Sequence, residues 1–270
     1  MHLRPQVFPD ATGLGDAAAR LVADAIATAG ARRFLLGCPG GRSASSTYQA
    51  LADLASRTDL DLSRLVIVMM DDYLVPDDAG RLVREDPRAP HSCERFGRRD
   101  ILGRINASLS AERRIPADNL WLPDPAAPEA YDDRLDDAGG VDLFLLASGA
   151  SDGHIAFNPA GSARDSRTRV VRLPDSTRTD NLATFPSFGG DLSHVPHFGV
   201  TVGIETISSL SRSVLMLCHG SDKGRAVSRL TAATEYEPGW PATVVTECRS
   251  PALLVDRAAE DAAGLLHVPG

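Results

Sequence analysis

Short, nearly uninterrupted runs of Val, Ile and Leu recur along the chain, and longer amphipathic stretches separate them. The clearest runs are residues 33–37, 65–70, 141–147, 198–202 and 214–218. Apolar strands that lack an alternating polar face are typical of parallel sheets covered by helices on both sides. The pattern therefore predicts five strands of a mostly parallel sheet.

The amphipathic stretches between these runs predict helices at residues 16–29, 44–56, 93–108, 128–138 and 222–233. A strand–helix alternation over the whole length indicates a doubly wound, Rossmann-like α/β fold with helices on both faces. No Gly/Ser-rich or Pro-rich linker and no internal repeat divides the chain. We therefore expect residues 1–270 to form a single domain.

Two polar segments interrupt the alternation. Residues 76–91 (PDDAGRLVREDPRAPH) are charged and proline-punctuated, which predicts an insertion loop. Residues 175–196, with PSFGGD at their centre, predict a flap. Long polar loops in compact domains are either functional lids or locally disordered insertions, and the sequence leaves both readings open.

Composition excludes several classes of function. The chain has 28 basic and 36 acidic residues, a formal charge of −8, which argues against binding to nucleic acid or to an anionic membrane. No apolar run reaches the roughly 20 residues of a membrane span, and the N-terminus has no export signal. The four cysteines show no CxxC spacing, so we expect no zinc site or disulfide framework and a cytoplasmic location.

The residues that follow the predicted strands are the candidates for chemistry, because ligands of open α/β sheets bind at the carboxyl ends of strands. Gly40, Gly41, Arg42 and Ser43 follow the first strand and open a helix, which favours an anion. The segment lacks the GxxxxGK[ST] and GxGxxG patterns, and a plain tight turn with Ser43 as N-cap remains the alternative.

Titratable residues follow three further strands. Asp71 and Asp72 can supply a general base held close to the substrate, and we assign the base to Asp71 and substrate binding to Asp72, although an aspartate after a strand is more often a turn cap. Asp152 and His154, on a glycine-flanked loop, suit proton transfer near neutral pH. Lys223, the single lysine of the chain, lies near a helix start, where it can contact a phosphate.

Together these segments resemble the glucosamine-6-phosphate deaminase/isomerase family and its sister group, the 6-phosphogluconolactonases. The resemblance covers nearly the full chain in order. It rests on LGCPGGRSASSTYQAL, VIVMMDDYLVP, VDLFLLASGASDGHIAFN, SRTR at 166–169, DLSHVPHFGVTVGIETI and HGSDKG. The combination of DGHIAFN with SRTR favours the deaminase branch.

The resemblance implies roles for individual residues. Asp71 matches the base that moves a proton between C1 and C2 of the sugar, and Asp152 with His154 matches the pair that opens the ring. Lys223 and the segment 40–43 match the phosphate end. The substrate implied is a small sugar phosphate, and such proton transfers require neither a metal nor an organic cofactor. Homo-oligomerisation stays open, because family members assemble differently.

Two departures from the family pattern bear on the substrate. Pro159 stands where the family has a glutamate that supports the ring-opening histidine, and Ala183 aligns with a phosphate-binding arginine. Arg42 and Arg178 are the candidates to replace that arginine. These departures predict a substrate that differs from glucosamine 6-phosphate.

Three functions remain open from the sequence. The first is a sugar-phosphate isomerase or deaminase. The second is a lactonase in which His154 activates water, and the third is a sugar-phosphate-binding protein with a degraded site.

Overall fold

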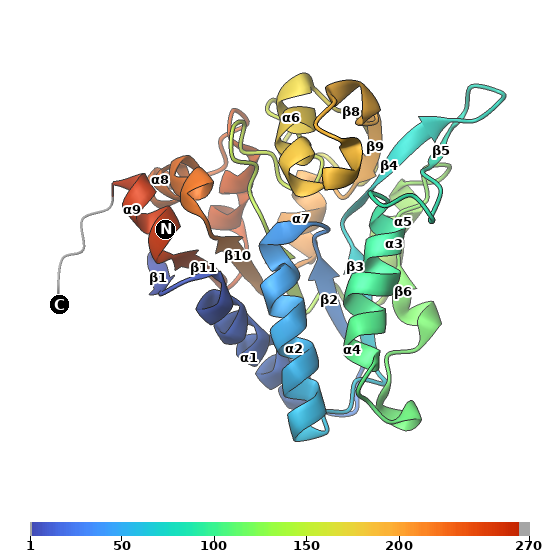
Figure 1. Ribbon diagram of the computed structural model, residues 1–270, viewed down its shortest axis with the longest axis vertical. Helices are drawn as coiled ribbons and strands as arrows, with labels where there is room; N and C mark the ends of the chain where they lie inside the picture. Colours follow the sequence, from blue (N-terminus) through green and yellow to red (C-terminus); the bar gives the residue numbers. More distant parts are fainter. Residues whose placement is uncertain (1, 265–270) are drawn as a thin grey trace.

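The main sheet consists of seven parallel strands in the order β1-β11-β10-β7-β2-β3-β6 (Figure 1). The computed structural model describes residues 2–264, except for the side chain of residue 183. The ends of the predicted 1–270 domain therefore lie outside the described residues. The strands are β1 (Pro5–Phe8), β2 (Phe34–Cys38), β3 (Leu65–Met69), β6 (Leu120–Trp121), β7 (Leu143–Leu146), β10 (Val214–Cys218) and β11 (Pro251–Asp256).

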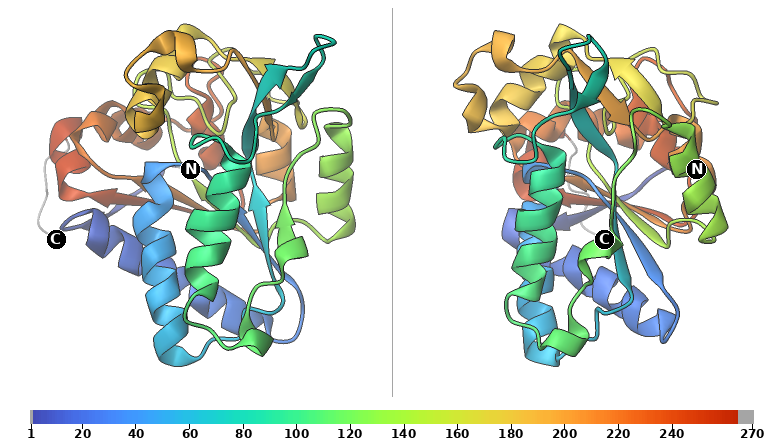
Figure 2. Two further views of the ribbon diagram at one scale, coloured as in Figure 1. Left: turned by 45° about the vertical axis from the view of Figure 1, so that its right-hand side comes forward. Right: turned by 90° about the vertical axis from the view of Figure 1, so that its right-hand side faces the viewer.

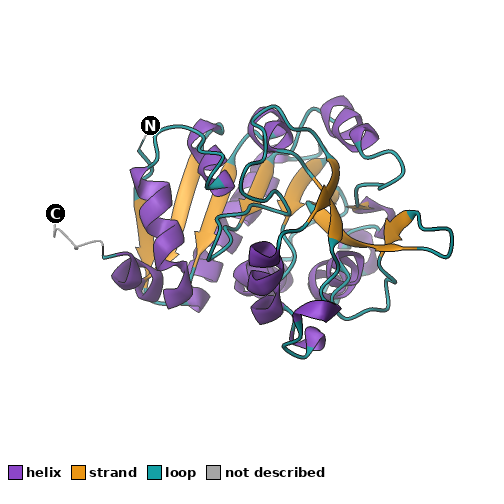
Figure 3. Cartoon of the chain, turned by 90° about the horizontal axis from the view of Figure 1, so that it is seen from above, coloured by secondary structure: helices purple, strands orange, loops and turns teal. Residues whose placement is uncertain are grey.

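Helices cover both faces of this sheet, as the sequence predicts (Figure 3). Neighbouring residues of one strand point to opposite sides, so Leu35 packs into one hydrophobic cluster and Leu36 into the other. One face carries α1 (Ala11–Ala29), α2 (Ser45–Thr58), α3 (Cys93–Phe96) and α4 (Arg104–Asn106), the last two joined by a π-helical segment at residues 97–103. The other carries α5 (Glu129–Asp137), α7 (Ile204–Leu210), α8 (Gly224–Ala232) and α9 (Arg257–Ala263).

A second, antiparallel sheet lies above the first in the order β5-β4-β9-β8 (Figure 2). Its strands are β4 (Asp71–Pro76), β5 (Leu82–Arg84), β8 (Arg169–Arg172) and β9 (Phe198–Thr201). The prediction that 198–202 belongs to the parallel sheet was therefore wrong, because β9 pairs antiparallel with β4 and β8. An apolar run identifies a strand but not its partner.

The two polar segments are more ordered than their composition suggests. Residues 76–91 contain β5, which pairs with β4 in the hairpin that projects from the molecule (Figure 2). Residues 175–196 contain helix α6 (Asp175–Thr184) and short 3-10 turns at 186–188 and 192–194. Among the described helices, none is both long and apolar enough to cross a membrane.

The strand order reverses between β2 and β7, and this reversal places the cavity described below. From β2 the chain continues to β3 and β6 on one side, whereas β7 is followed by β10 and β11 on the other. Gly37 pairs with Phe144 across the reversal, and a Cβ on Gly37 would lie 1.9 Å from the Phe144 ring. The two strands can therefore pair here only because residue 37 lacks a side chain. Loops that leave β2 and β7 diverge, so a crevice opens between them.

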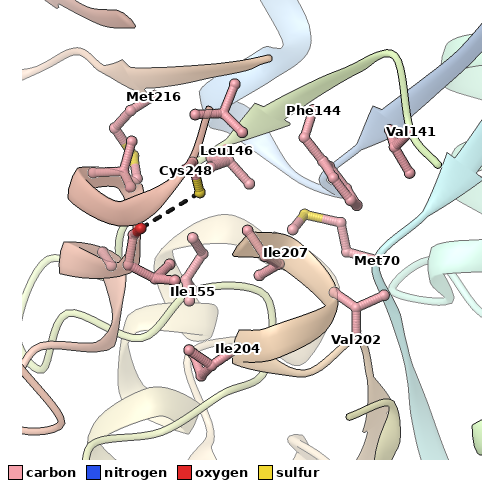
Figure 4. Close-up of a cluster of buried hydrophobic side chains, with 14 of the residues drawn as sticks. Met70, Val141, Phe144, Leu146, Ile155, Val202, Ile204, Ile207, Met216 and Cys248 are labelled. Carbon is pink, nitrogen blue, oxygen red and sulfur yellow. Dashed lines mark hydrogen bonds between the residues drawn. The ribbon is translucent and has the colours of Figure 1, made fainter. Parts of the chain in front are cut away.

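The face opposite α1 and α2 is filled by a continuous apolar cluster (Figure 4). Phe144 and Leu146 of β7 contribute to it from the sheet, and Ile204 and Ile207 of α7 from the covering helix. Met70, the residue between β3 and β4, belongs to the same cluster and is fully buried. Its burial anchors the chain at the point where it passes from the main sheet to the small one.

Asp132 of α5 joins the small sheet to the rest of the domain. Its carboxylate accepts hydrogen bonds from the Thr168 backbone N–H (2.8 Å), the Thr168 hydroxyl (2.8 Å) and the Thr206 hydroxyl (2.6 Å). Asp132 is almost completely buried, and Thr168 immediately precedes β8. Three buried donors thus depend on one side chain.

We predict that Asp132→Ala lowers the free energy of unfolding by about 2–4 kcal/mol, because it leaves these donors buried without acceptors. The neighbouring Asp133 carboxylate is largely exposed and pairs with Arg167 on the surface. Asp133→Ala, the matched control, should cost less than about 1 kcal/mol. Urea denaturation of both variants measures the difference, and equal losses would contradict the role of Asp132.

Candidate active site

A cavity of about 280 Å³ lies at the carboxyl ends of the central strands, beneath helix α6. Its walls come from the segments that follow β2, β3, β7 and β10, four of the strand ends from which the sequence predicts chemistry. The predicted site residues that line it are Gly40, Arg42, Ser43, Asp71, His154 and Lys223. The reversal of strand order between β2 and β7 thus brings together residues that are far apart in the sequence.

Asp71 begins β4 and is buried at the cavity wall. Burial, with a smaller contribution from the adjacent Asp72, raises the pKa of its carboxyl group to about 7, although hydrogen bonding by Cys93 and the proximity of His154 oppose the rise. The Cys93 thiol donates to Asp71 Oδ1 at 3.4 Å. A carboxylate with a pKa near neutrality accepts and returns protons efficiently, so Asp71 has the properties of a general base.

His154 is held by Asp152. The distance from His154 Nδ1 to Asp152 Oδ1 is 2.7 Å, and Asp152 Oδ2 accepts hydrogen bonds from the hydroxyls of Ser176 (2.9 Å) and Thr177 (2.7 Å) on α6. Burial alone would raise the pKa of Asp152, but the hydrogen bonds from His154 and Thr177 outweigh it and bring this pKa well below the usual range. Asp152 therefore stays ionised and fixes the imidazole through Nδ1.

The local sequence permits this pairing because of two glycines. A Cβ on Gly149 would lie 2.2 Å from His154 Nδ1, so a side chain there would displace the ring. Gly153, between the aspartate and the histidine, has φ of 68°, and its Cβ would meet the Trp240 ring at 2.2 Å. The turn that brings Asp152 back to His154 is thus accessible to glycine alone.

Lys223 and the loop after β2 form the cationic end of the cavity. Lys223 is buried and its Nζ donates to the Ser148 carbonyl at 2.7 Å. Burial lowers its pKa, and the Arg42 guanidinium lowers it further. Arg42 itself forms an ion pair with Asp222. Gly41, although not on the cavity wall, turns the loop with φ of 86°.

Two predicted binding residues point elsewhere. Asp72 is fully buried and accepts hydrogen bonds from the backbone N–H groups of Tyr73 (2.9 Å), Cys93 (2.8 Å) and Glu94 (3.2 Å). It therefore anchors the start of α3, and it is absent from the cavity wall. The expectation that Asp72 binds substrate is corrected accordingly, because its oxygens are engaged by the backbone.

Arg178 is also directed away from the cavity. Its guanidinium donates to the carbonyls of Val195 (2.9 Å) and Leu192 (2.5 Å) and pairs with Asp175 at 2.7 Å. These bonds tie residues 192–195, which follow α6, to that helix. The proposal that Arg178 replaces the missing phosphate-binding arginine is therefore corrected, since its five donors cannot reach a ligand in the cavity without breaking them.

Several cavity residues were missed from the sequence, and most lie on or near α6. They are Cys93, Phe157, Thr179, Asp180, Asn181, Thr184 and Phe185. The polar composition of 175–196 was the available signal, but it did not distinguish a flap from the roof of a site.

Three residues could hold a metal ion. Donor atoms of Asp152, His154 and Asp180 all lie within 4.8 Å of one another. However, the Asp152 carboxylate already bonds to His154, Ser176 and Thr177, and Asp180 accepts two backbone hydrogen bonds. Metal binding would have to replace these bonds, so the arrangement fits a histidine–carboxylate pair better than a metal centre.

Known proteins resemble this chain over most of its length. A glucosamine-6-phosphate deaminase of Bacillus pumilus is 32% identical over 258 residues, which cover 93% of this chain and 96% of that protein. One from Streptomyces avermitilis is 37% identical over 224 residues, covering 82% and 78%.

Solved structures share the fold. A monomeric glucosamine-6-phosphate deaminase superposes with a TM-score of 0.80 at 26% identity, covering 96% of this chain and all of that one. A 6-phosphogluconolactonase of Thermotoga maritima has a TM-score of 0.61 at 21% identity, over 93% and 98%, and shows the shared fold alone. The model of the family described as glucosamine-6-phosphate isomerases/6-phosphogluconolactonase matches residues 9–254. The chain therefore belongs to the glucosamine-6-phosphate isomerase/6-phosphogluconolactonase family.

Proposed function

We propose that this protein is an aldose–ketose isomerase that deaminates an amino-sugar phosphate. The observation that carries the proposal is the arrangement of one cavity: a buried carboxylate with a pKa near 7, a histidine held by a carboxylate, and a buried lysine. The relatives named glucosamine-6-phosphate deaminase support the same chemistry.

Ring opening is assigned to His154 and Asp152. The imidazole transfers a proton from the anomeric hydroxyl to the ring oxygen, and Asp152 keeps it oriented and stabilises its positive charge. The bond from Nδ1 to Asp152 leaves Nε2 for this proton transfer. The product of the step is the open-chain aldose.

Isomerisation is assigned to Asp71. Its ionised carboxylate removes the proton from C2 while a proton passes from the ammonium group to the aldehyde oxygen, which gives an enolamine. Asp71 then returns the carbon proton to C1, which gives the protonated imine. The resulting imine at C2 adds water and loses ammonia, which leaves a ketose phosphate. Lys223 and the loop Gly40–Ser43 hold the phosphate.

A lactone hydrolase is the second candidate, and Pro159 favours it. Proline offers no carboxylate at the position after Asn158, and hydrolysis of a lactone requires no ring-opening relay. In that reaction His154 would activate water against the lactone carbonyl, and Asp71 would have no role as a carbon base.

Isotope exchange distinguishes the two functions. The protein should introduce deuterium at C1 or C2 of one sugar when it is incubated in D₂O with glucosamine 6-phosphate, galactosamine 6-phosphate, or fructose 6-phosphate plus ammonium. NMR measures this exchange.

Asp71→Asn should reduce this exchange by about 10²- to 10⁴-fold, because the amide cannot accept the carbon proton. Asp78→Asn, the same change at an exposed position of the β4–β5 hairpin, should leave it unchanged. Faster loss of 6-phosphogluconolactone without any C–H exchange would instead establish the hydrolase.

The pH dependence should report the ionisation of Asp71. Because the base must be deprotonated and its pKa is about 7, kcat/KM should rise as the pH increases through about 7. Cys93→Ala removes a hydrogen bond that lowers this pKa, so the midpoint should move to higher pH.

Cys93→Ser keeps a donor at the same position and serves as the control. The substrate phosphate also titrates near pH 6, but its contribution is identical in all three proteins. A midpoint that is the same in Cys93→Ala and the wild type would exclude Asp71 as the titrating base.

A further inference from the structure

Asp180, on the underside of helix α6, takes part in neither the base nor the histidine pair of the proposed mechanism. Its Oδ2 accepts hydrogen bonds from the backbone N–H groups of Ala150 (2.9 Å) and Ser151 (3.0 Å), and the residue lines the cavity. The same oxygen is 3.9 Å from His154 Nδ1, which is beyond hydrogen-bond distance. Asp180 is thus bonded to the loop backbone rather than to the imidazole.

Consecutive backbone N–H groups that point the same way form a small anion-binding concavity. Ala150 and Ser151 provide such a pair at the carboxyl end of β7, on the loop whose Ser148 carbonyl accepts the bond from Lys223. In this protein the concavity is filled by a carboxylate of the protein itself. A phosphate bound by Lys223 therefore also lies in the field of this carboxylate.

The charges around the cavity strengthen this conclusion. Apart from the His154 imidazole, the basic side chains of the described wall are Arg42 and Lys223, and Arg42 is already paired with Asp222. Asp180 adds a second carboxyl group, which interacts electrostatically with Lys223. Asp71 contributes another when the pH exceeds about 7. Carboxylates thus balance or outnumber cations where the phosphate has to bind.

We propose that Asp180 is an internal anion that competes with the substrate phosphate and so sets the affinity of the cavity for phosphorylated sugars. This inference rests on the proposed function in one respect, that the substrate carries a phosphate. The negative charge of Asp180 weakens the binding of a phosphate dianion. It weakens the binding of substrates with a smaller negative charge to a lesser extent.

A purely structural role is the competing explanation, and it makes the opposite prediction. Thr177 and Asp180 are three residues apart and lie on one face of α6, where Thr177 bonds to Asp152 and Asp180 to the loop. Both contacts fasten the helix over the cavity. If fastening were the whole role of Asp180, its replacement would loosen the roof and weaken the binding of phosphate.

Asp180→Asn separates the two explanations, because the side-chain amide keeps an oxygen for the two backbone donors but loses the charge. The probe is inorganic phosphate, titrated calorimetrically at low ionic strength. We expect the dissociation constant to fall by about tenfold in Asp180→Asn, and the gain to shrink as salt is added. Asp175→Asn, which removes the same charge from the exposed side of α6, should leave the dissociation constant unchanged.

Phosphate affinity that is unchanged or lower in Asp180→Asn would overturn the proposal, as would an absence of phosphate binding in both the wild type and the variant. Circular dichroism verifies that the variant is folded. If it is not, Asp180→Ser, which also lacks the charge and retains an acceptor, replaces it in the same titration. Because the titration requires no turnover, it remains decisive even when the isotope-exchange experiment refutes the isomerase.

Discussion

The pairing of β2 with β7 is the contact on which the site depends. Gly37 leaves space for the Phe144 ring, so two strands separated by more than a hundred residues can lie side by side at the point where the strand order reverses. The loops that follow them diverge, and the cavity forms between these loops. Asp71, His154 and Lys223 come from the segments that follow β3, β7 and β10 of this sheet, and α6 packs over the crevice.

Two carboxyl groups at the site, Asp71 on the cavity wall and Asp152 behind His154, have contrasting environments. Asp71 meets one weak thiol donor, so burial dominates and its pKa rises to about 7. Asp152 receives a strong bond from His154 and hydroxyl donors from α6, so its pKa falls well below the usual range. Environments that separate the pKa values of neighbouring acids assign them different roles. In the proposed mechanism Asp71 carries the proton and Asp152 is a permanent counter-charge.

Helix α6 connects these parts. Ser176 and Thr177 stabilise the charge on Asp152, and Asp180 occupies the backbone donors of the adjacent loop. Arg178, on the same helix, is directed away from the cavity and donates hydrogen bonds to the carbonyls of Leu192 and Val195. One short helix therefore holds Asp152, roofs the cavity and contributes a carboxyl group to its wall.

The sequence by itself predicted strands β2, β3, β7 and β10 and the helical segments α1, α2, α3–α4, α5 and α8 near their observed positions, because apolar runs and amphipathic periodicity are local signals. It did not predict strands β1, β6 and β11 or helices α6, α7 and α9. It also predicted that segments 40–43, 152–154 and residues Asp71 and Lys223 approach one another, since the carboxyl ends of neighbouring parallel strands share one edge. Only the tertiary structure decided which side chains face the cavity. Asp72 is held by N–H groups 21 and 22 residues later, Arg178 by a carbonyl 17 residues later, and Asp180 by an amide 30 residues earlier. Such partners are set by how distant segments pack, and no local pattern in the chain records them.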